Sequence, residues 1–244
     1  MHTAIAIIPA RYGSTRLPGK ALLDIEGKPL IRRVYERVIG ASRVSRVIVA
    51  TDDPRIAEAV AAFGGEVVMT SPLHRSGTDR VAEAAVIAGG DIVVNVQGDE
   101  PFIEPEVIDL VVRRVVEDQE ISCSTAASPI SDEAVWRDSN AVKVVTDLRG
   151  RALYFSRSPM PFWRDSGFGG AFLHIGIYCF RREFLLRYAS LEPTPLERAE
   201  KLEQLRMIEH GWSIGVAETD HGSIGVDTEA DLETVRRICR ERGL

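Results

Sequence analysis

The sequence predicts an α/β protein built on a single Rossmann-like, mostly parallel sheet with helices on both faces. Short apolar runs of strand length alternate with longer segments in which apolar residues recur every three or four positions. The short runs are continuously apolar, which is typical of strands that are buried on both faces. Strand and helix in regular succession indicate helices that connect parallel strands. The length of 244 residues permits one large α/β domain, or one domain with a substantial insertion.

The first half of the chain supplies the regular alternation. The first strand is predicted at residues 4–8, where Pro9 ends an apolar run. A helix is predicted from Pro29 to Gly40, because proline is common at the first helical position and glycine after the last. The same patterns predict strands at 47–51, 66–70 and 92–97, and helices from Pro54, around 81–88 and from Pro105.

The pattern changes after about Asp132. Strands at 141–146 and 151–155 flank a turn at 147–150, which predicts a hairpin. We expect the segment from about 132 to 190 to be a strand-rich insertion within a single domain of residues 1–244. Further elements are predicted as a strand at 172–180, one amphipathic helix at 195–211, and a last helix from Thr228 to about 240 with Asp231 completing a capping box.

Charge and composition disfavour several classes of protein. The net charge of −6 and the pI of about 5.5 provide no basic field for a nucleic acid. The cysteines Cys123, Cys179 and Cys239 are widely separated, so we expect buried thiols in a reducing compartment rather than a disulfide framework or a zinc site. Neither a signal-peptide pattern nor an apolar stretch of about 18–20 residues is present. We therefore expect a soluble, cytoplasmic protein that binds neither nucleic acid nor membrane.

A basic loop with two glycines follows the first strand. Ligands of open parallel sheets bind outside the carboxyl ends of the strands, and here Arg11, Arg16 and Lys20 provide three positive charges. The loop is not a P-loop, because five residues separate its glycines and an alanine follows the lysine. A merely solvated basic loop is the alternative interpretation. Its position after the first strand favours a site for a small phosphate compound.

Two carboxylates are candidates for a metal site. Asp99 follows the strand at 92–97, and Asp227 directly precedes the last helix. Both could converge above the sheet and bind Mg²⁺, which prefers oxygen ligands and bridges phosphates. The alternatives are a turn acid for Asp99 and an acid that stabilises a helix N-terminus for Asp227.

Other polar residues could contact a ligand. Ser76, Gly77 and Thr78 precede a predicted helix and could receive a ligand through their backbone groups, although Ser76 or Thr78 could equally be an N-cap. Gln97 offers both a hydrogen-bond donor and an acceptor, and a structural glutamine is its alternative.

Eight motifs in order along the chain resemble the 3-deoxy-manno-octulosonate (KDO) cytidylyltransferase family. They occupy residues 11–20 (RYGSTRLPGK), 74–80 (HRSGTDR), 96–101 (VQGDEP), 140–145 (NAVKVV), 154–157 (YFSR), 174–178 (HIGIY), 203–206 (EQLR) and 225–228 (GVDT). The resemblance implies a nucleotide-diphospho-sugar transferase fold and magnesium-dependent transfer of CMP from CTP to the anomeric hydroxyl of a 2-keto-3-deoxy sugar acid. It also implies a homodimer built on the insertion.

The resemblance assigns roles to individual residues. Catalysis is expected from Arg11, Lys20, Asp99 and Asp227, of which Asp99 and Asp227 bind the metal. The expected nucleotide-binding residues are Pro9, Ala10, Arg11, Arg16, Lys20, Ser76, Gly77, Thr78, Gln97 and Asp99. The expected sugar-binding residues are Arg157 as the carboxylate clamp, and His174, Tyr178, Glu203 and Gln204 as ligands of the hydroxyl groups. The alternative for His174 is a structural histidine. The alternative for Glu203 and Gln204 is an ordinary solvated helix face.

Several functions remain open from sequence. The same chemistry on a related ulosonic acid is one, because two residues separate Gly222 from Gly225 where the family commonly has one, and the loop at 159–170 has its own arrangement. A uridylyl- or guanylyltransferase would share the fold. A non-catalytic nucleotide-binding module is a different class, which the presence of Lys20, Asp99 and Asp227 disfavours.

Overall fold

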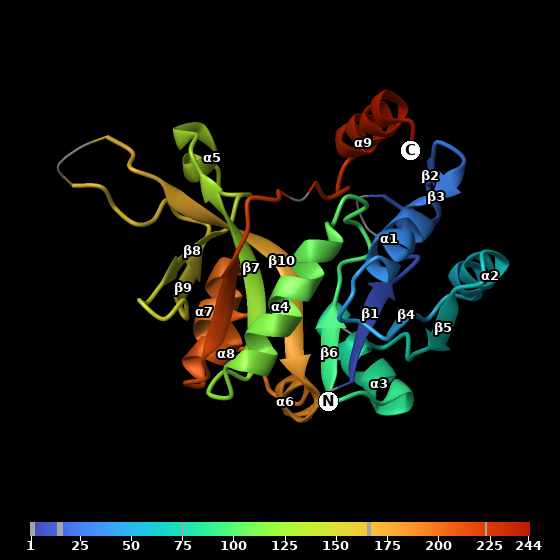
Figure 1. Ribbon diagram of the computed structural model, residues 1–244, viewed down its shortest axis with the longest axis horizontal. Coiled ribbons are helices and arrows are strands. Elements are labelled where there is room, and N and C mark those ends of the chain that lie inside the picture. Colours follow the sequence, from blue (N-terminus) through green and yellow to red (C-terminus); the bar gives the residue numbers. More distant parts are fainter. Residues whose placement is uncertain (1–2, 14–16, 75, 165–166, 223) are drawn as a thin grey trace. The chain divides into compact units, whose positions relative to one another are not determined.

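The computed structural model describes residues 3–13, 17–74, 76–164, 167–222 and 224–244 (Figure 1). The chain forms two compact units, of which unit 1 comprises residues 1–109 and 223–244 and unit 2 comprises residues 110–222. The chain passes from unit 1 to unit 2 within helix α4 (Pro105–Glu117). The strand-rich segment predicted at about 132–190 lies inside unit 2. None of the helices in the described ranges is both long enough and apolar enough to cross a membrane.

Unit 1 is built on a parallel sheet with the strand order β6–β1–β4–β5. Nearly all residues of β1 are buried, on both sides of the strand, so both of its faces are covered. The predicted α/β class is therefore confirmed. The strands are β1 (Ala4–Ala10), β4 (Arg46–Thr51), β5 (Glu66–Met69) and β6 (Ile92–Asn95).

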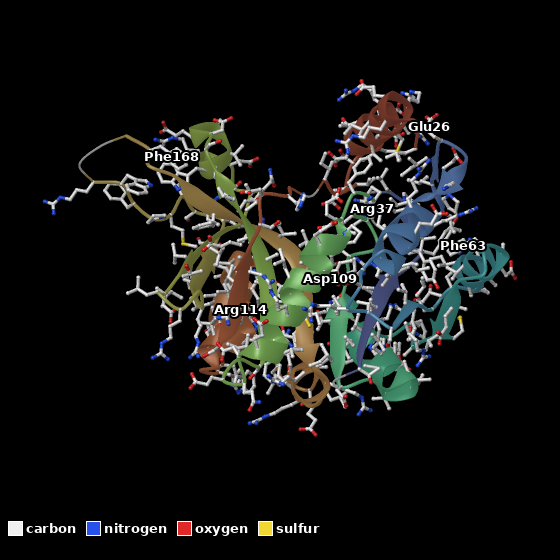
Figure 2. The ribbon with its side chains drawn as sticks, in the orientation of Figure 1. Glu26, Arg37, Phe63, Asp109, Arg114 and Phe168 are labelled. Atoms are coloured by element: carbon white, nitrogen blue, oxygen red, sulfur yellow. The ribbon has the colours of Figure 1, made fainter. Side chains whose placement is uncertain are left out.

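Helices connect these parallel strands, as predicted. They are α1 (Leu30–Ile39), α2 (Pro54–Ala62) and α3 (Gly77–Ala88), and the chain ends in α9 (Glu229–Arg242). The short elements η1 (Lys20–Leu22), β2 (Asp24–Ile25) and β3 (Lys28–Pro29) follow the basic loop. Asp109, labelled in Figure 2, belongs to α4. Its carboxylate accepts hydrogen bonds from the backbone N–H groups of Ser42 and Arg43 at 3.0 and 2.8 Å. This contact fixes the loop that leaves α1.

Unit 2 contains a mixed sheet with the order β11–β7–β10–β8–β9. β7 is parallel to β11 and antiparallel to β10, and the predicted hairpin is formed by β8 and β9. The strands are β7 (Cys123–Ile130), β8 (Lys143–Thr146), β9 (Ala152–Ser156), β10 (Ala171–Arg181) and β11 (Ile214–Glu218). The helices are α5 (Glu133–Arg137), α6 (Arg182–Ala189), α7 (Pro195–Glu200) and α8 (Leu205–Glu209).

The prediction of one helix at 195–211 was wrong. Lys201 adopts a left-handed conformation, with φ of +56°, and ends α7 by donating its N–H to the carbonyl of Glu197 at 2.8 Å. The chain then begins α8 only at Leu205. Glu203 and Gln204 therefore lie between two short helices and not on one helix face. The sequence patterns also do not predict β7, α6 and β11.

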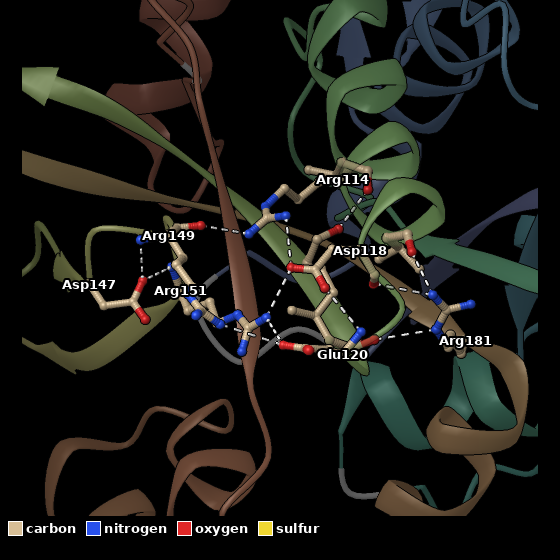
Figure 3. A network of polar contacts seen from close by, with 11 residues as sticks. Arg114, Asp118, Glu120, Asp147, Arg149, Arg151 and Arg181 are labelled. Atoms are coloured by element: carbon tan, nitrogen blue, oxygen red, sulfur yellow. Dashed lines mark hydrogen bonds and ion pairs between the residues drawn. The ribbon is translucent and has the colours of Figure 1, made fainter.

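A network of arginines and acids fixes the turn of the β8–β9 hairpin (Figure 3). Arg151 lies 3.3 Å from Asp118 and 2.5 Å from Glu120, and Arg114 of α4 lies 3.1 Å from Asp118. Arg114 also donates to the carbonyl of Arg149 at 2.9 Å. The network thus joins the end of α4 and the segment before β7 to the hairpin turn within unit 2.

Candidate functional site

The loop after β6 approaches the carboxyl end of β1 closely. A Cβ atom on Gly98 would lie 2.8 Å from the carbonyl oxygen of Pro9, so the approach requires glycine. Gly19 has a φ of +68°, and its N–H donates to the carbonyl of Tyr12 at 2.9 Å, which closes the basic loop. Ala10 is buried, Pro9 and Lys20 are half-buried, and Arg11 is exposed. Arg16 lies outside the described residues.

Lys20 joins the two predicted metal carboxylates. Its ammonium Nζ lies 2.5 Å from Oδ2 of Asp99, 3.2 Å from Oδ1 of Asp227 and 2.9 Å from the carbonyl oxygen of Val226. The side chains are partly buried, with exposed fractions of 17% for Lys20, 30% for Asp99 and 49% for Asp227. The structure therefore brings together three of the four predicted catalytic residues.

Two sets of hydrogen bonds explain why carboxylates 128 positions apart in the sequence meet. The N–H of Val226 donates to the carbonyl of Asp99 at 2.9 Å, which ties the segment before α9 to the end of β6. Thr228 is the N-cap of α9, and Asp231 completes the predicted capping box. The same Asp231 oxygen accepts from the N–H groups of Asp227 and Thr228 at 3.0 and 2.8 Å. The cap thereby positions the backbone that carries Asp227.

The oxygens around Lys20 fit magnesium. Mg²⁺ takes about six oxygen ligands and usually keeps waters or substrate phosphates among them. Asp99, Asp227 and Val226 offer two carboxylates and a carbonyl, and they already surround one positive charge. The part of the chain that the structure describes contains no group of three or more His, Cys, Asp or Glu side chains suited to a metal.

The residues predicted to recognise the base lie at the start of α3. Ser76 is the N-cap: its Oγ accepts from the N–H of Asp79 at 3.1 Å, and the Asp79 carboxylate accepts from the N–H of Ser76 at 3.2 Å. Gly77 and Thr78 belong to the first turn of the helix. A Cβ on Gly77 would lie 3.4 Å from the Pro9 ring, so this helix end packs against the residue that opens the basic loop. Gln97 is half-buried just beyond β6.

In unit 2, Arg157 is held by main-chain carbonyls. Its Nε donates to the carbonyl of Glu200 at 2.9 Å, and its Nη1 donates to the carbonyl of Ser139 at 3.1 Å. The Glu200 carboxylate accepts from the N–H of Arg157 at 3.0 Å and from the Ser156 hydroxyl at 2.6 Å. Lys143 is buried and donates to the carbonyl of Arg157 at 2.6 Å. Sequence reasoning missed Glu200 and Lys143; a lysine between apolar residues at 140–145 was the available signal.

His174 is fixed as a neutral ring by Thr125, a residue of the unpredicted strand β7. The Thr125 hydroxyl lies 2.7 Å from the carbonyl of Ile177, 3.1 Å from that of Ile175 and 2.9 Å from Nε2 of His174. Carbonyls only accept, so the single hydroxyl proton points to them and Nε2–H donates to Thr125. Nδ1 is then left as an acceptor. Burial lowers the pKa of His174 from 6.5 to about 3.

The remaining predicted sugar-binding residues are Tyr178, Glu203 and Gln204, and one of them has a buried polar atom without a hydrogen-bond partner among the described residues. The ring of Tyr178 lies 5.5 Å from that of His174, and burial raises the pKa of Tyr178 well above its usual range. The Tyr188 hydroxyl donates to the carbonyl of Glu203 at 2.7 Å. Nε2 of Gln204 is buried and has no hydrogen-bond partner among the described residues. An unsatisfied buried donor costs about 1–3 kcal/mol, which a ligand oxygen would offset.

The pKa of His174 predicts an acid-dependent loss of stability. Its depressed folded-state pKa means that only the unfolded chain takes up a proton as the pH falls below about 6.5. The contribution of the neutral His174 ring to the free energy of unfolding is fully present above pH 6.5 and is lost as the pH falls toward 3. Between pH 7.5 and 5.5, we expect wild type to lose about 1 kcal/mol more unfolding free energy than His174→Gln, measured by urea denaturation. Equal losses in the two proteins would contradict this.

The parallel sheet, the basic loop and the joined carboxylates define a nucleotidyltransferase. Residues 5–214 match a family model described as cytidylyltransferase. The chain is 55% identical over 241 residues to the 3-deoxy-manno-octulosonate cytidylyltransferase of Geobacter metallireducens, covering 94% of this chain and 95% of the relative. The chain belongs to the 3-deoxy-manno-octulosonate cytidylyltransferase family.

Solved structures agree with this membership. The structure of a CMP:2-keto-3-deoxy-manno-octonic acid synthetase complexed with CTP superimposes with a TM-score of 0.94 at 44% identity, covering 98% of this chain and 99% of that one. A cytidylyltransferase from Leptospira borgpetersenii has a TM-score of 0.68 at 20% identity, covering 99% of this chain and 88% of its own, and this likeness concerns the fold.

Proposed function

We propose that this chain transfers CMP from CTP to the anomeric hydroxyl of KDO, giving CMP-KDO and pyrophosphate for lipopolysaccharide synthesis in the cytoplasm. The observation that carries the proposal is the meeting of Lys20, Asp99 and Asp227 beside the basic loop, in a chain of this family. The bond from the anomeric oxygen to the α-phosphorus forms while the bond from that phosphorus to the bridging oxygen breaks. Pyrophosphate leaves, and the hydroxyl proton is released to solvent.

Such a reaction depends on positioning and on the neutralisation of charge. We assign Arg11, Arg16 and Lys20 to the triphosphate, where they offset the charge of the leaving pyrophosphate. Asp99 and Asp227 would hold Mg²⁺, which would supply positive charge to neutralise the reacting phosphate groups. In the same proposal, the start of α3 and Gln97 receive the cytosine, so that unit 1 carries the nucleotide-binding residues.

Unit 2 carries the proposed sugar-binding residues. The two carbonyls on Arg157 occupy Nε and one hydrogen of Nη1. These contacts leave Nη2 and one hydrogen of Nη1 for the sugar carboxylate, which a guanidinium can bind with two hydrogen bonds. Nδ1 of His174 accepts from one hydroxyl, and the amide of Gln204 donates to another oxygen. Tyr178 and Glu203 complete the set.

Pyrophosphate release tests the proposal. Each of the four nucleoside triphosphates is combined with KDO, an amino-KDO and a nine-carbon sialic acid, with and without Mg²⁺. We expect release with CTP, KDO and Mg²⁺ together. Release only with another sugar acid would favour a related ulosonic acid as substrate, and release only with UTP or GTP would reassign the nucleotide. No release in any combination would favour a non-catalytic binding module.

Arg157→Ala should raise the KM for the sugar acid about tenfold to a hundredfold, because a charged hydrogen-bonded contact contributes about 1.5–3 kcal/mol. The KM for CTP should stay near that of wild type. Steady-state kinetics with each substrate varied separately check this. The exposed Arg137, which pairs with Glu133 at 2.6 Å on α5, provides the matched control Arg137→Ala. A defect confined to CTP would refute the carboxylate clamp.

We also propose a homodimer formed through unit 2. Three apolar side chains there are highly exposed, with fractions of 108% for Leu148, 58% for Leu153 and 84% for Phe162. β9, which carries Leu153, pairs with β8 alone among the described strands, and an unpaired strand edge invites contact with another chain. Light scattering should give twice the monomer mass for wild type and a lower mass for Leu153→Lys. A monomeric wild type would exclude the proposal.

A further inference from the structure

The ammonium of Lys20 has no donor left for a phosphate in this structure. An ammonium carries three N–H donors. Among the described residues, three acceptors lie within reach: Oδ2 of Asp99 at 2.5 Å, the carbonyl of Val226 at 2.9 Å and Oδ1 of Asp227 at 3.2 Å. A lysine that binds the triphosphate must therefore release at least one of these oxygens. Contacts with all three oxygens and a contact with the triphosphate therefore cannot exist together.

We infer that Lys20 is a built-in counter-ion that occupies the carboxylate pair until the nucleotide binds. The inference rests on the proposed function, since it is the phosphates of CTP that draw the ammonium away. Asp99 and Asp227 then receive the divalent cation together with the nucleotide and not before it. One lysine side chain thereby sets the order in which metal and nucleotide bind.

Electrostatics favour this occupancy in the free enzyme. Two carboxylates that lie near one ammonium repel each other, and the positive charge between them offsets the repulsion. Lys20 is 17% exposed, so its attraction to the acids is screened less than that of a surface pair. Lys28 provides the contrast within unit 1. Its one acidic partner among the described residues is Glu36 at 2.7 Å, and both side chains are exposed by more than a third.

Metal binding in the absence of nucleotide tests the inference. The dissociation constant for Mn²⁺ is measured from the paramagnetic resonance signal of the free ion, on the full chain without CTP. We expect Lys20→Met to bind Mn²⁺ at least tenfold more tightly than wild type, because the competing cation is gone. Lys28→Met removes a lysine from an exposed pair and should bind like wild type. The double variant Lys20→Met with Asp99→Asn should not show this increase in Mn²⁺ affinity, because a carboxylate ligand is lost.

Two further measurements make the outcome decisive. Thermal unfolding shows whether Lys20→Met is folded, and Lys20→Gln replaces it if it is not. Equal or weaker Mn²⁺ binding by the folded Lys20 variant would overturn the inference, even if wild type releases pyrophosphate from CTP and KDO. Absence of pyrophosphate release by wild type would overturn the proposed function instead, while the Mn²⁺ comparison would still report on the lysine.

Discussion

Asp99→Asn and Asp227→Asn should each lower kcat by about a hundredfold to a thousandfold, the range seen when one electrostatic contact to a transition state is removed. The amide keeps the size and an acceptor oxygen of the carboxylate but loses its charge. An amide is a poor magnesium ligand beside a carboxylate. The loss should therefore appear in turnover at saturating substrates, measured as initial rates of pyrophosphate release.

The fold should survive both substitutions. Asp99 and Asp227 are 30% and 49% exposed, and both pair with Lys20. Far-UV circular dichroism and thermal unfolding close to those of wild type would show this. Asp24→Asn alters an exposed acid of β2 in the same unit and is the matched control. Wild-type turnover in either site variant would remove that residue from the metal pair.

The largest loss of stability is expected from Glu197→Ala. The Arg206 guanidinium donates to both carboxylate oxygens of Glu197, at 2.7 and 2.5 Å, and each side chain is only 9% exposed. Removing one partner leaves a buried charge without compensation, which costs about 3–5 kcal/mol. Urea denaturation should show a loss of that size. Glu133→Ala removes the exposed pair with Arg137 and should lower the free energy of unfolding by less than about 1 kcal/mol.

A double variant separates the buried charge from lost packing. Glu197→Met combined with Arg206→Met should be more stable than Glu197→Ala, because no unpaired charge remains. Arg206 also lies 5.0 Å from the ring of Tyr188, whose hydroxyl holds the carbonyl of Glu203. If the double variant is less stable than the single one, packing around Tyr188 accounts for the effect and the charge does not.

Much of unit 1 could be predicted from sequence because its signals are local. Continuous apolar runs such as 47–51 indicate buried parallel strands, and Thr228 with Asp231 indicates a helix start. β7 could not be predicted, since Cys123–Ile130 is rich in alanine and serine and contains a proline. The break at Lys201 depends on one backbone conformation, which its residue type does not encode.

The candidate site also contains residues that a local sequence pattern identifies and contacts that no such pattern indicates. Charged residues in motifs identify Lys20, Asp99 and Asp227, but a basic residue beside glycines suggests a phosphate ligand and gives no sign that it bridges two acids. The carbonyl of Val226 has no side-chain signature at all. Thr125 acts through tertiary contacts across β7 and β10, so no motif contains it with His174. Contacts between segments that are distant in the sequence leave no local pattern, so they could not be predicted.

The capping box of α9 has a consequence for genetic screens. A search for loss-of-function substitutions should return Asp231 together with Asp227, although Asp231 is assigned no contact with a substrate, because its carboxylate holds the Asp227 backbone. Thermodynamics distinguishes the two positions. Asp231→Ala should lower the free energy of unfolding by about 1 kcal/mol, as lost helix caps do, whereas Asp227→Asn should leave it unchanged. An inactive phenotype alone would misassign a structural carboxylate to the chemistry.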